Sequence, residues 1–407
     1  MPSDPIPVLF VHFGEQWIRG SERLLLDLLT HLDRRRVEPI IWCNGAPMAA
    51  ACRAASFTTY HSDFTYFFDN DSAPFDACRY GSFVRQGIRL VRQHEIRVLH
   101  SNSAAPSQFL VPVSRATRVP LLAHLHSYYL RRSRFICLLH QASLVVGVSQ
   151  QVIGDFLRDG MAAERLKVIY NGVDFTRLER RNDDDLRQKL CIADDTIVVS
   201  TVGYLVRGKG HDVVINALKI LNAKSNVHLL VAGEGPERSN LERLTAELEF
   251  QARVHFLGHC DDPGSVYRAT DIIALGSRAD AFGLVLAEAG YFAIPAVATC
   301  VGGIPEVVQH EKTGLLVAPD NPAAFATALA RLVGDPAHRR QLGIAAKERV
   351  EQLFSSERMV ADFHETYDQL ALVPRWQLGW LGAAASLNPY LRLLHLRRRA
   401  AISPSRP

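Results

Sequence analysis

The amino-acid sequence predicts an α/β protein built from two doubly wound parallel sheets. Short apolar runs alternate with helical patterns through both halves of the chain, as in a succession of β–α–β units. The chain has 407 residues, which is too long for one ordinary hydrophobic core. Its content of 48% apolar and 22% charged residues is typical of a soluble globular protein. These observations predict two domains.

In the first half, the apolar run at residues 8–11 is expected to be a buried strand. The loop Arg19-Gly20-Ser21-Glu22 follows it and opens an apolar-periodic helix that continues through Leu32. Further apolar runs occupy residues 120–126 and 145–149.

In the second half, four strands are expected, at residues 196–202, 227–232, 254–257 and 272–275. Ligands of such sheets bind beyond the carboxyl ends of the strands. The loops that begin there contain glycine, at residues 203–210, 233–236 and 258–260. The cleft between the two domains is therefore the expected binding site.

The most informative segment follows the last of these strands. It reads Asp280-Ala-Phe-Gly-Leu-Val-Leu-Ala-Glu288, and Gly302-Gly303-Ile-Pro-Glu306 comes soon after it. Seven residues separate the first two carboxylates, which places Asp280 at the start of a helix and Glu288 about two turns inside it. Such a place suits a ligand that carries phosphate and hydroxyl groups.

This segment resembles the signature of the retaining group 1 glycosyltransferases, which have the two-domain GT-B fold and use nucleotide-activated sugars. The family usually has Glu at the position of Asp280, and Arg at the position of Tyr204. The likeness covers roughly residues 6 to 370. It includes the Gly20-Ser21-Glu22 loop, which is similar to the family's Gly-Gly-x-Glu loop, and the runs at 145–149 and 168–174.

The resemblance implies two Rossmann-like domains that face a central cleft. Residues 1–175 would form the acceptor-side domain, and 176–355 the domain that binds the nucleotide sugar. A helix at 356–371 would cross back onto the first domain, and 372–407 would form a basic, apolar tail.

The resemblance also implies roles for individual residues. The catalytic set would be His126, Arg207, Lys209 and Asp280. Arg207 and Lys209 would stabilise the charge that grows on the departing diphosphate, and the Glu288 carboxylate would accept hydrogen bonds from the ribose diol. The donor-binding set would be Gly20, Glu22, Arg207, Lys209, Asp280, Phe282, Gly283, Leu284, Glu288 and Glu306.

The reaction implied is transfer of a hexose from a UDP- or GDP-sugar to a glycan or lipid-linked acceptor, in the assembly of a surface polysaccharide or glycolipid. It would retain the anomeric configuration and need no metal or other cofactor. Two alternatives stay open: an isomerase or phosphorylase of the same fold, and a non-catalytic nucleotide-sugar-binding protein. Paired carboxylates acting as in a glycosidase would be a rival mechanism, but Asp280 and Glu288 have separate roles in the family, which disfavours it.

Several candidate residues have a simpler structural explanation. Asp280 is a good helix N-cap, Glu288 could pair with a surface cation, and the 203–210 loop could be a solvated basic turn. His124 and His126 lie on one face of a strand, as two zinc ligands would, although no third ligand follows at a typical spacing. An aromatic and acidic segment at residues 57–80 could bind a sugar acceptor or form core.

Charge is segregated along the chain, with net values of +4 for residues 1–175, −6 for 176–371 and +6 for 372–407. The last segment has no acidic residue and combines Trp376 and Trp380 with leucines and arginines, so contact with an anionic membrane is expected. No uninterrupted apolar run reaches 18 residues, and the seven cysteines are scattered. A cytoplasmic protein, peripheral at the inner membrane face, is the prediction; a nucleic-acid partner is not expected.

Overall fold

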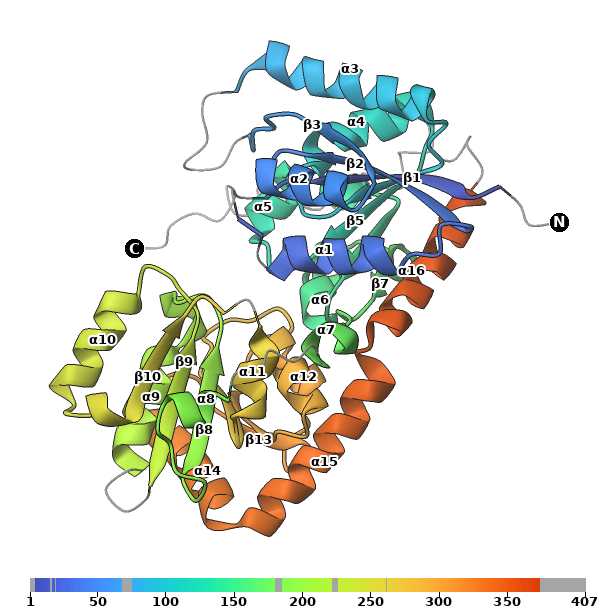
Figure 1. Ribbon diagram of the computed structural model, residues 1–407. Helices are drawn as coiled ribbons and strands as arrows, with labels where there is room; N and C mark the ends of the chain where they lie inside the picture. The colour runs from blue at the N-terminus through green and yellow to red at the C-terminus, as the bar shows by residue number, and fades with distance from the viewer. Residues whose placement is uncertain are drawn as a thin grey trace, which may run out of the picture. The chain divides into compact units, whose positions relative to one another are not determined.

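The protein divides into two compact units, each built on one parallel sheet (Figure 1). The computed structural model describes residues 4–14, 17–18, 20–67, 75–179, 185–221, 226–260 and 262–373. One unit holds the chain up to Tyr170 together with the segment from Glu357, and the other runs from Asn171 to Ser356. The predicted α/β class with two parallel sheets is confirmed.

The first unit contains a seven-stranded sheet in the order β3-β2-β1-β4-β5-β6-β7, with every pairing parallel. Because β1, β4 and β5 are neighbours in this order, the residues that follow them lie side by side at the carboxyl end of the sheet. The strands are β1 (Ile6–His12), β2 (Val37–Cys43), β3 (Thr58–His61), β4 (Val98–Ser101), β5 (Leu121–Leu125), β6 (Leu144–Gly147) and β7 (Leu166–Val168).

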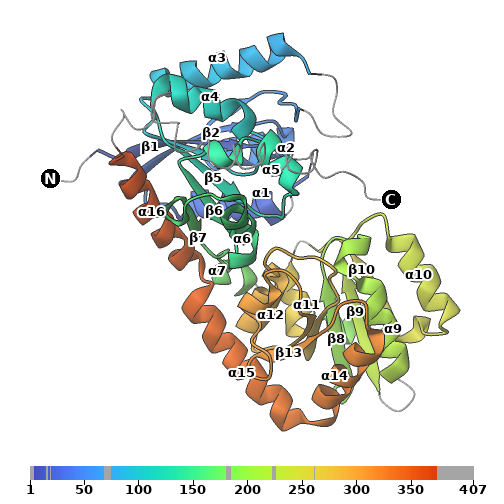
Figure 2. The same ribbon diagram turned by 180° about the vertical axis from the view of Figure 1, so that it is seen from behind.

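Helices cover both faces of this sheet, as the view from behind in Figure 2 also shows. On one face α1 and α16 pack on β1, with Phe10, Leu25 and Phe363 in one buried cluster. The helices are α1 (Gly20–His31), α2 (Ala46–Ala54), α3 (Ala77–Gln93), α4 (Ser107–Thr117), α5 (Arg131–Ile136), α6 (Gln150–Asp159) and α16 (Ser356–Ala371).

The aromatic segment considered as an acceptor surface contributes mainly to the core of the other face. Phe64 packs edge-on against Trp42 of β2 and contacts Phe83 of α3, and Phe64 and Phe67 are both buried. Among the described residues of this group, Phe75 is the exposed aromatic residue, with 45% of its surface accessible. Phe68, Asp69 and Asp71 lie outside the described residues.

The second unit contains a six-stranded parallel sheet in the order β10-β9-β8-β11-β12-β13. Its strands are β8 (Ile197–Val202), β9 (Val227–Ala232), β10 (Val254–Gly258), β11 (Ile272–Leu275), β12 (Ala296–Thr299) and β13 (Gly314–Val317). Its helices are α7 (Phe175–Glu179), α8 (Leu186–Lys189), α9 (His211–Leu221), α10 (Arg238–Glu247), α11 (Pro263–Arg268), α12 (Leu284–Tyr291), α13 (Ile304–Val307), α14 (Pro322–Gly334) and α15 (Pro336–Leu353).

Residues 171–175 belong to this second unit, because they pair with the end of α15 rather than with β7. The Val173 N–H donates to the Phe354 carbonyl at 2.7 Å, and Val173 forms a parallel bridge with Ser355. Helix α16 then belongs to the first unit, where it buries Met359, Phe363 and Tyr367.

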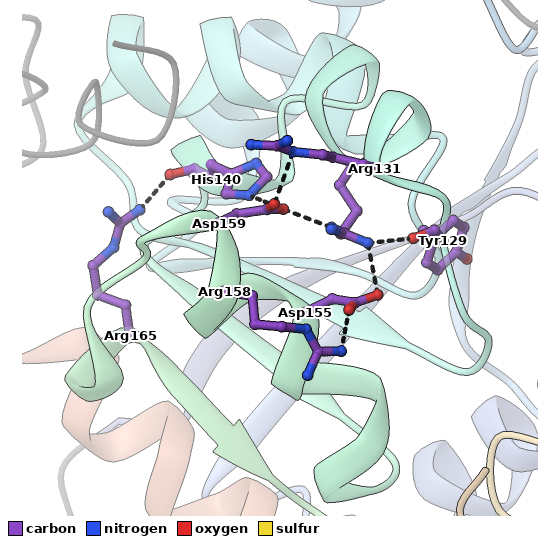
Figure 3. Close-up of polar contacts among 8 residues, drawn as sticks. Tyr129, Arg131, His140, Asp155, Arg158, Asp159 and Arg165 are labelled. Atoms are coloured by element: carbon purple, nitrogen blue, oxygen red, sulfur yellow. Dashed lines mark hydrogen bonds and ion pairs between the residues drawn. The ribbon is translucent and has the colours of Figure 1, made fainter. Parts of the chain in front are cut away.

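A buried charge cluster joins α5 to α6 in the first unit (Figure 3). Asp159 is 4% exposed and accepts hydrogen bonds from Arg134 Nε at 2.8 Å and from His140 Nε2 at 3.1 Å. Arg131 Nε lies 3.1 Å from the second Asp159 oxygen, and Arg134 also donates to Asp155. This cluster uses all its carboxylates internally and therefore has a structural role.

Within the described ranges, no helix is long and apolar enough to cross a membrane. The proposed membrane-binding tail lies outside the described residues except for Leu372 and Val373.

Candidate functional site

In the second unit, Asp280 lies in the loop between β11 and α12 and organises the start of that helix. Its Oδ1 accepts hydrogen bonds from the backbone N–H of Phe282 at 3.2 Å and of Gly283 at 2.9 Å. Its Oδ2 accepts one from Lys209 Nζ at 2.7 Å. Asp280 is therefore not the N-cap of α12, which is Gly283, because its carboxylate bonds to N–H groups of the loop before the helix and, at the same time, to a cation.

This arrangement involves two of the predicted donor-binding residues. The resemblance implies that Phe282, Gly283 and Leu284 bind the donor. In the structure the N–H groups of the first two are already bonded to Asp280, because the loop folds back on the carboxylate. These two N–H groups therefore hold the Asp280 side chain in place.

The loop after β8 brings one of its two predicted cations to Asp280. Lys209 is about one-third exposed, whereas the Asp280 side chain is 10% exposed, so the ion pair is partly shielded from water. Arg207 is exposed, and within the described residues its side chain contacts no carboxylate. The structure thus places Lys209, and not Arg207, beside Asp280.

Arg278 holds this loop in place, and the sequence did not indicate it. Its Nη1 and Nη2 donate to the two Asp212 oxygens at 2.9 and 2.7 Å, and its Nε donates to Asp320 at 2.6 Å. The hydrogen bonds to Asp212 raise the pKa of the Arg278 guanidinium. Arg278 also donates to the Arg207 carbonyl at 2.6 Å, and its own N–H bonds to the Gly208 carbonyl. It is a fixed cation that braces residues 207–208.

Glu288 of α12 is buried and held by two side chains of the same unit. Its Oε1 accepts a hydrogen bond from Arg177 Nη2 at 3.0 Å, and its Oε2 accepts one from the Tyr267 hydroxyl at 2.7 Å. Burial, together with the nearby Glu288 charge, raises the pKa of Tyr267, so this phenol stays neutral and donates. Glu288 is therefore oriented in advance, and each oxygen keeps a second lone pair that can accept from a ligand.

The Gly302-Gly303 turn packs against the Asp280 loop and leads into α13, which carries Glu306. A Cβ on Gly303 would lie 2.1 Å from the Ala281 carbonyl oxygen, so only glycine allows this approach. The Gly303 N–H also donates to the Asp280 carbonyl at 3.0 Å. Glu306 lies half-buried in the first turn of α13, where Arg349 holds its backbone carbonyl at 2.6 Å.

In the first unit, Glu22 is not an open ligand-facing carboxylate but part of a buried chain of polar groups. Its Oε1 lies 3.1 Å from His12 Nε2, and Ser21 donates to its Oε2 at 3.0 Å. Gly14 packs directly against this pair, since a Cβ on Gly14 would lie 2.3 Å from Glu22 Oε1. Gly20 begins α1 and is exposed, with open space around its Cβ position.

His126 follows β5 and belongs to the same buried chain of polar groups. Its Nε2 lies 3.1 Å from Asn102 Oδ1, and burial lowers the pKa of its imidazole to about 3. His124 is buried against the His126 ring and Phe363, with centroid distances of 4.1 and 5.0 Å. Among the described residues, no three His, Cys, Asp or Glu side chains are grouped so that they could hold a metal ion.

Sequence reasoning missed five residues of these sites: His12, Asn102, Arg177, Tyr267 and Arg278. His12 and Asn102 had a usable signal, because each is a polar residue at the carboxyl end of an apolar strand. Arg278 lies two residues before Asp280 and could have been found in the same way. Nothing in the sequence marks Arg177 or Tyr267, which reach Glu288 only through the packing of α7 and α11 on α12.

Two family models together match most of the chain. Residues 182–349 match the model described as "Glycosyl transferases group 1", and residues 18–177 match the model described as "Glycosyltransferase Family 4".

Curated relatives include two named enzymes. An N-acetyl-alpha-D-glucosaminyl L-malate synthase of Bacillus anthracis is 28% identical over 229 residues, which cover 56% of this chain and 60% of the relative. A D-inositol 3-phosphate glycosyltransferase of Rhodococcus opacus is 35% identical over 219 residues, which cover 51% of this chain and 49% of the relative. The match thus spans about half of the length of these proteins.

Solved structures share the fold over nearly their whole length. Anabaena Alr3699/HepE in complex with UDP aligns with a TM-score of 0.78 and 23% identity, covering 89% of this chain and all of that chain. A glycosyltransferase from Rickettsia africae aligns with a TM-score of 0.80 and 20% identity, covering 91% of this chain and all of that chain.

Proposed function

This chain belongs to the group 1 glycosyltransferases and has their GT-B fold, and from that premise we propose that it transfers a hexose from a nucleotide diphosphate sugar to an acceptor hydroxyl. The observation that carries the proposal is the Lys209–Asp280 pair at the carboxyl end of the second sheet. It puts a cation and a hydrogen-bond acceptor where a ligand with phosphate and hydroxyl groups is expected.

The proposed reaction retains the anomeric configuration. The bond between the sugar C1 and the diphosphate oxygen breaks, and the acceptor oxygen bonds to C1 on the same face. The acceptor proton passes to the departing phosphate, so that no separate general base is required. Lys209 neutralises the charge that develops on the leaving oxygen, and no metal is needed in this scheme.

The other residues position the donor in this proposal. Asp280 accepts hydrogen bonds from sugar hydroxyls, and Glu288, already oriented by Arg177 and Tyr267, accepts them from the ribose diol. A contact of His126 with the donor sugar, which the resemblance implies, stays a prediction. UDP is the favoured nucleotide, because structural neighbours have been solved with UDP and with UDP-glucose.

The acceptor proposed from the sequence is a glycan or a lipid-linked sugar in the assembly of a surface polysaccharide or glycolipid. The names of the two curated relatives favour a second class, small anionic alcohols, because L-malate and inositol 3-phosphate each carry a hydroxyl and a negative charge. An acceptor panel should therefore contain both classes.

The decisive experiment measures release of nucleoside diphosphate with and without acceptor. First, a panel of UDP-, GDP- and ADP-sugars is screened for thermal stabilisation of the protein, which identifies the donor. We expect diphosphate release only with an acceptor present, unchanged by EDTA. Turnover without acceptor would instead indicate an isomerase or a hydrolase, stimulation by inorganic phosphate a phosphorylase, and donor binding without any turnover a non-catalytic protein.

Replacing Asp280 by Asn separates its charge from its role in holding the loop before α12. The Asn oxygen can still accept from the N–H groups of Phe282 and Gly283, so the melting temperature should change little. Loss of the charge that orients Lys209 should lower kcat on the order of tenfold or more. Asp280→Glu, the family's usual residue, should keep most of the activity. Wild-type turnover in Asp280→Asn would show that Asp280 only holds this loop.

We also propose that residues 372–407 hold the protein at the anionic cytoplasmic face of a membrane. Each Lys or Arg near such a surface contributes about 1 kcal/mol of attraction. Sedimentation with phosphatidylglycerol-containing vesicles at low salt should recover the full chain but not a chain ending at Leu372, and phosphatidylcholine vesicles should recover neither. Equal binding of both chains to the anionic vesicles would refute the proposal.

A further inference from the structure

Helix α3 of the first unit packs on α4 with one side and turns its other side outward (Figure 2). The ring centroids of Phe83 and of Phe109 in α4 are 5.6 Å apart, and a Cβ on Gly87 would lie 2.7 Å from Val113 Cγ2. Residues three and four apart share one side of a helix, so these contacts fix its rotation. Residues about half a turn away therefore face outward.

Three arginines occupy this outward side: Arg85, Arg89 and Arg92. All three are exposed, and the structure shows no ion pair between any of them and a described residue. Helix α3 itself contains no acidic residue that could neutralise them. Their charge is therefore available to an anionic partner outside the chain.

These arginines belong to a longer basic surface, which consists of three adjoining surface hollows. Arg92 lines both the first and the second hollow, and Arg97 lines both the second and the third. Among the described residues that line them, Glu95 is the one acidic residue. The arginines of the three hollows, here called the arginine face, are Arg85, Arg89, Arg92, Arg97 and Arg118.

The arginine face ends where the chain enters its last segment, residues 372–407. Val373 also lines the third hollow, and the Arg97 side chain donates to the Ala371 carbonyl at 3.2 Å, at the end of α16. Leu372 beside it is 78% exposed. The segment from 372 to 407 adds six arginines and no acidic residue. The folded surface and this segment thus carry charge of the same sign and adjoin each other in the chain.

We propose that the arginine face binds the anionic headgroups of a membrane together with residues 372–407. The proposal rests on the membrane contact proposed above for that segment. Guanidinium groups pair well with lipid phosphates. Apolar side chains also favour a bilayer over a nucleic acid, because Ile88 lies among the arginines of the first hollow and Leu372 is exposed beside the third. No aromatic side chain on which a base could stack is found among the described residues that line the hollows.

The position of the arginine face is compatible with transfer. Arg97 directly precedes β4 and Pro120 directly precedes β5, so the second and third hollows lie at the amino ends of these strands. Ligands of parallel sheets bind at the opposite, carboxyl ends. Membrane contact through the arginine face therefore leaves the carboxyl end of the first sheet open.

The first test measures the affinity of full-length protein for vesicles that contain phosphatidylglycerol, at low salt. The triple variant carries Arg85→Gln, Arg89→Gln and Arg92→Gln, which keep a good helix former at each position and remove three charges. Arg97 stays, because it also holds the end of α16. The loss of three cations near an anionic surface should weaken binding on the order of ten- to a hundredfold.

The matched control carries the same change in charge on the second unit. Arg243→Gln, Lys312→Gln and Arg340→Gln remove three exposed cations that do not belong to the arginine face. This variant should bind like the wild type. Wild-type affinity in the triple variant, or an equal loss in the control, overturns the inference.

The second test locates the contact residue by residue. Phenylglyoxal modifies accessible arginines, and mass spectrometry of peptides gives the extent of modification at each. Vesicles with phosphatidylglycerol should protect Arg85, Arg89 and Arg92 several-fold, whereas Arg340 should react equally with and without them. Vesicles of phosphatidylcholine should protect none. Unchanged modification of the three α3 arginines in the presence of anionic vesicles contradicts the proposal.

Two further outcomes separate this inference from its alternatives. Because both contacts would act on one bilayer, the loss of either should lower the apparent affinity. Equal binding of the full chain and of a chain ending at Leu372 would refute the contact by the last segment, and loss of binding in the triple variant would then still support the arginine face. If the triple variant keeps its affinity for vesicles but loses retention on heparin, the face binds an acidic polymer, and the inference is overturned.

Discussion

Replacing Lys209 by alanine is expected to lower kcat by about a hundredfold or more. The Nζ of Lys209 lies 2.7 Å from Asp280, on a partly shielded surface where charges interact more strongly than in water. In the proposed reaction its contact with the leaving diphosphate strengthens as the bond to the sugar breaks. An interaction made mainly in the transition state affects kcat more than donor binding. Steady-state kinetics with saturating acceptor would measure both constants.

The matched control for this variant is Lys312→Ala, which removes an exposed lysine of the same unit that forms no ion pair with Asp280 among the described residues. It should turn over like wild type. A Lys209→Ala protein with normal kcat and only a raised donor KM would assign Lys209 to ground-state binding, and the proposed transition-state role would be wrong.

The largest effect on stability is expected for Asp159→Ala, with a loss of about 3 to 5 kcal/mol in the free energy of unfolding. Asp159 is the shared acceptor of Arg134, His140 and Arg131 (Figure 3). Arg134 is 5% exposed, so removal of the carboxylate leaves a buried guanidinium whose positive charge is only partly neutralised by its remaining partners. Denaturation by urea, monitored by circular dichroism, would give the difference directly.

Glu351→Ala provides the comparison, because it breaks an ion pair with Lys347 in which both side chains are nearly half exposed. The expected change is within about 0.5 kcal/mol, since solvent screens such pairs. A similar, small effect for both variants would mean that the Asp159 cluster relaxes or admits water when the carboxylate is removed.

Much of the fold could be predicted because it depends on local pattern. The runs predicted at residues 196–202 and 272–275 are β8 and β11, and residues 8–11 lie within β1. The Ser of the 145–149 run caps α6 by accepting from the Val152 N–H at 3.3 Å. The Gly302-Gly303 turn was recognised from its residues alone, and its steric cause, the contact with Ala281, became visible only in the structure.

The sequence by itself pointed to the short segments on which the proposed function depends: the glycine turns, the Asp280 to Glu288 spacing, and the basic loop at residues 203–210. These depend on residue type and spacing, which are local properties. The partners of those residues were decided only by the tertiary structure. Glu288 meets Arg177 across 111 positions, and His12 meets Asn102 across 90. Such pairs depend on the order of strands in each sheet and on how helices pack on it, because a parallel sheet brings together strand ends that are far apart in the chain.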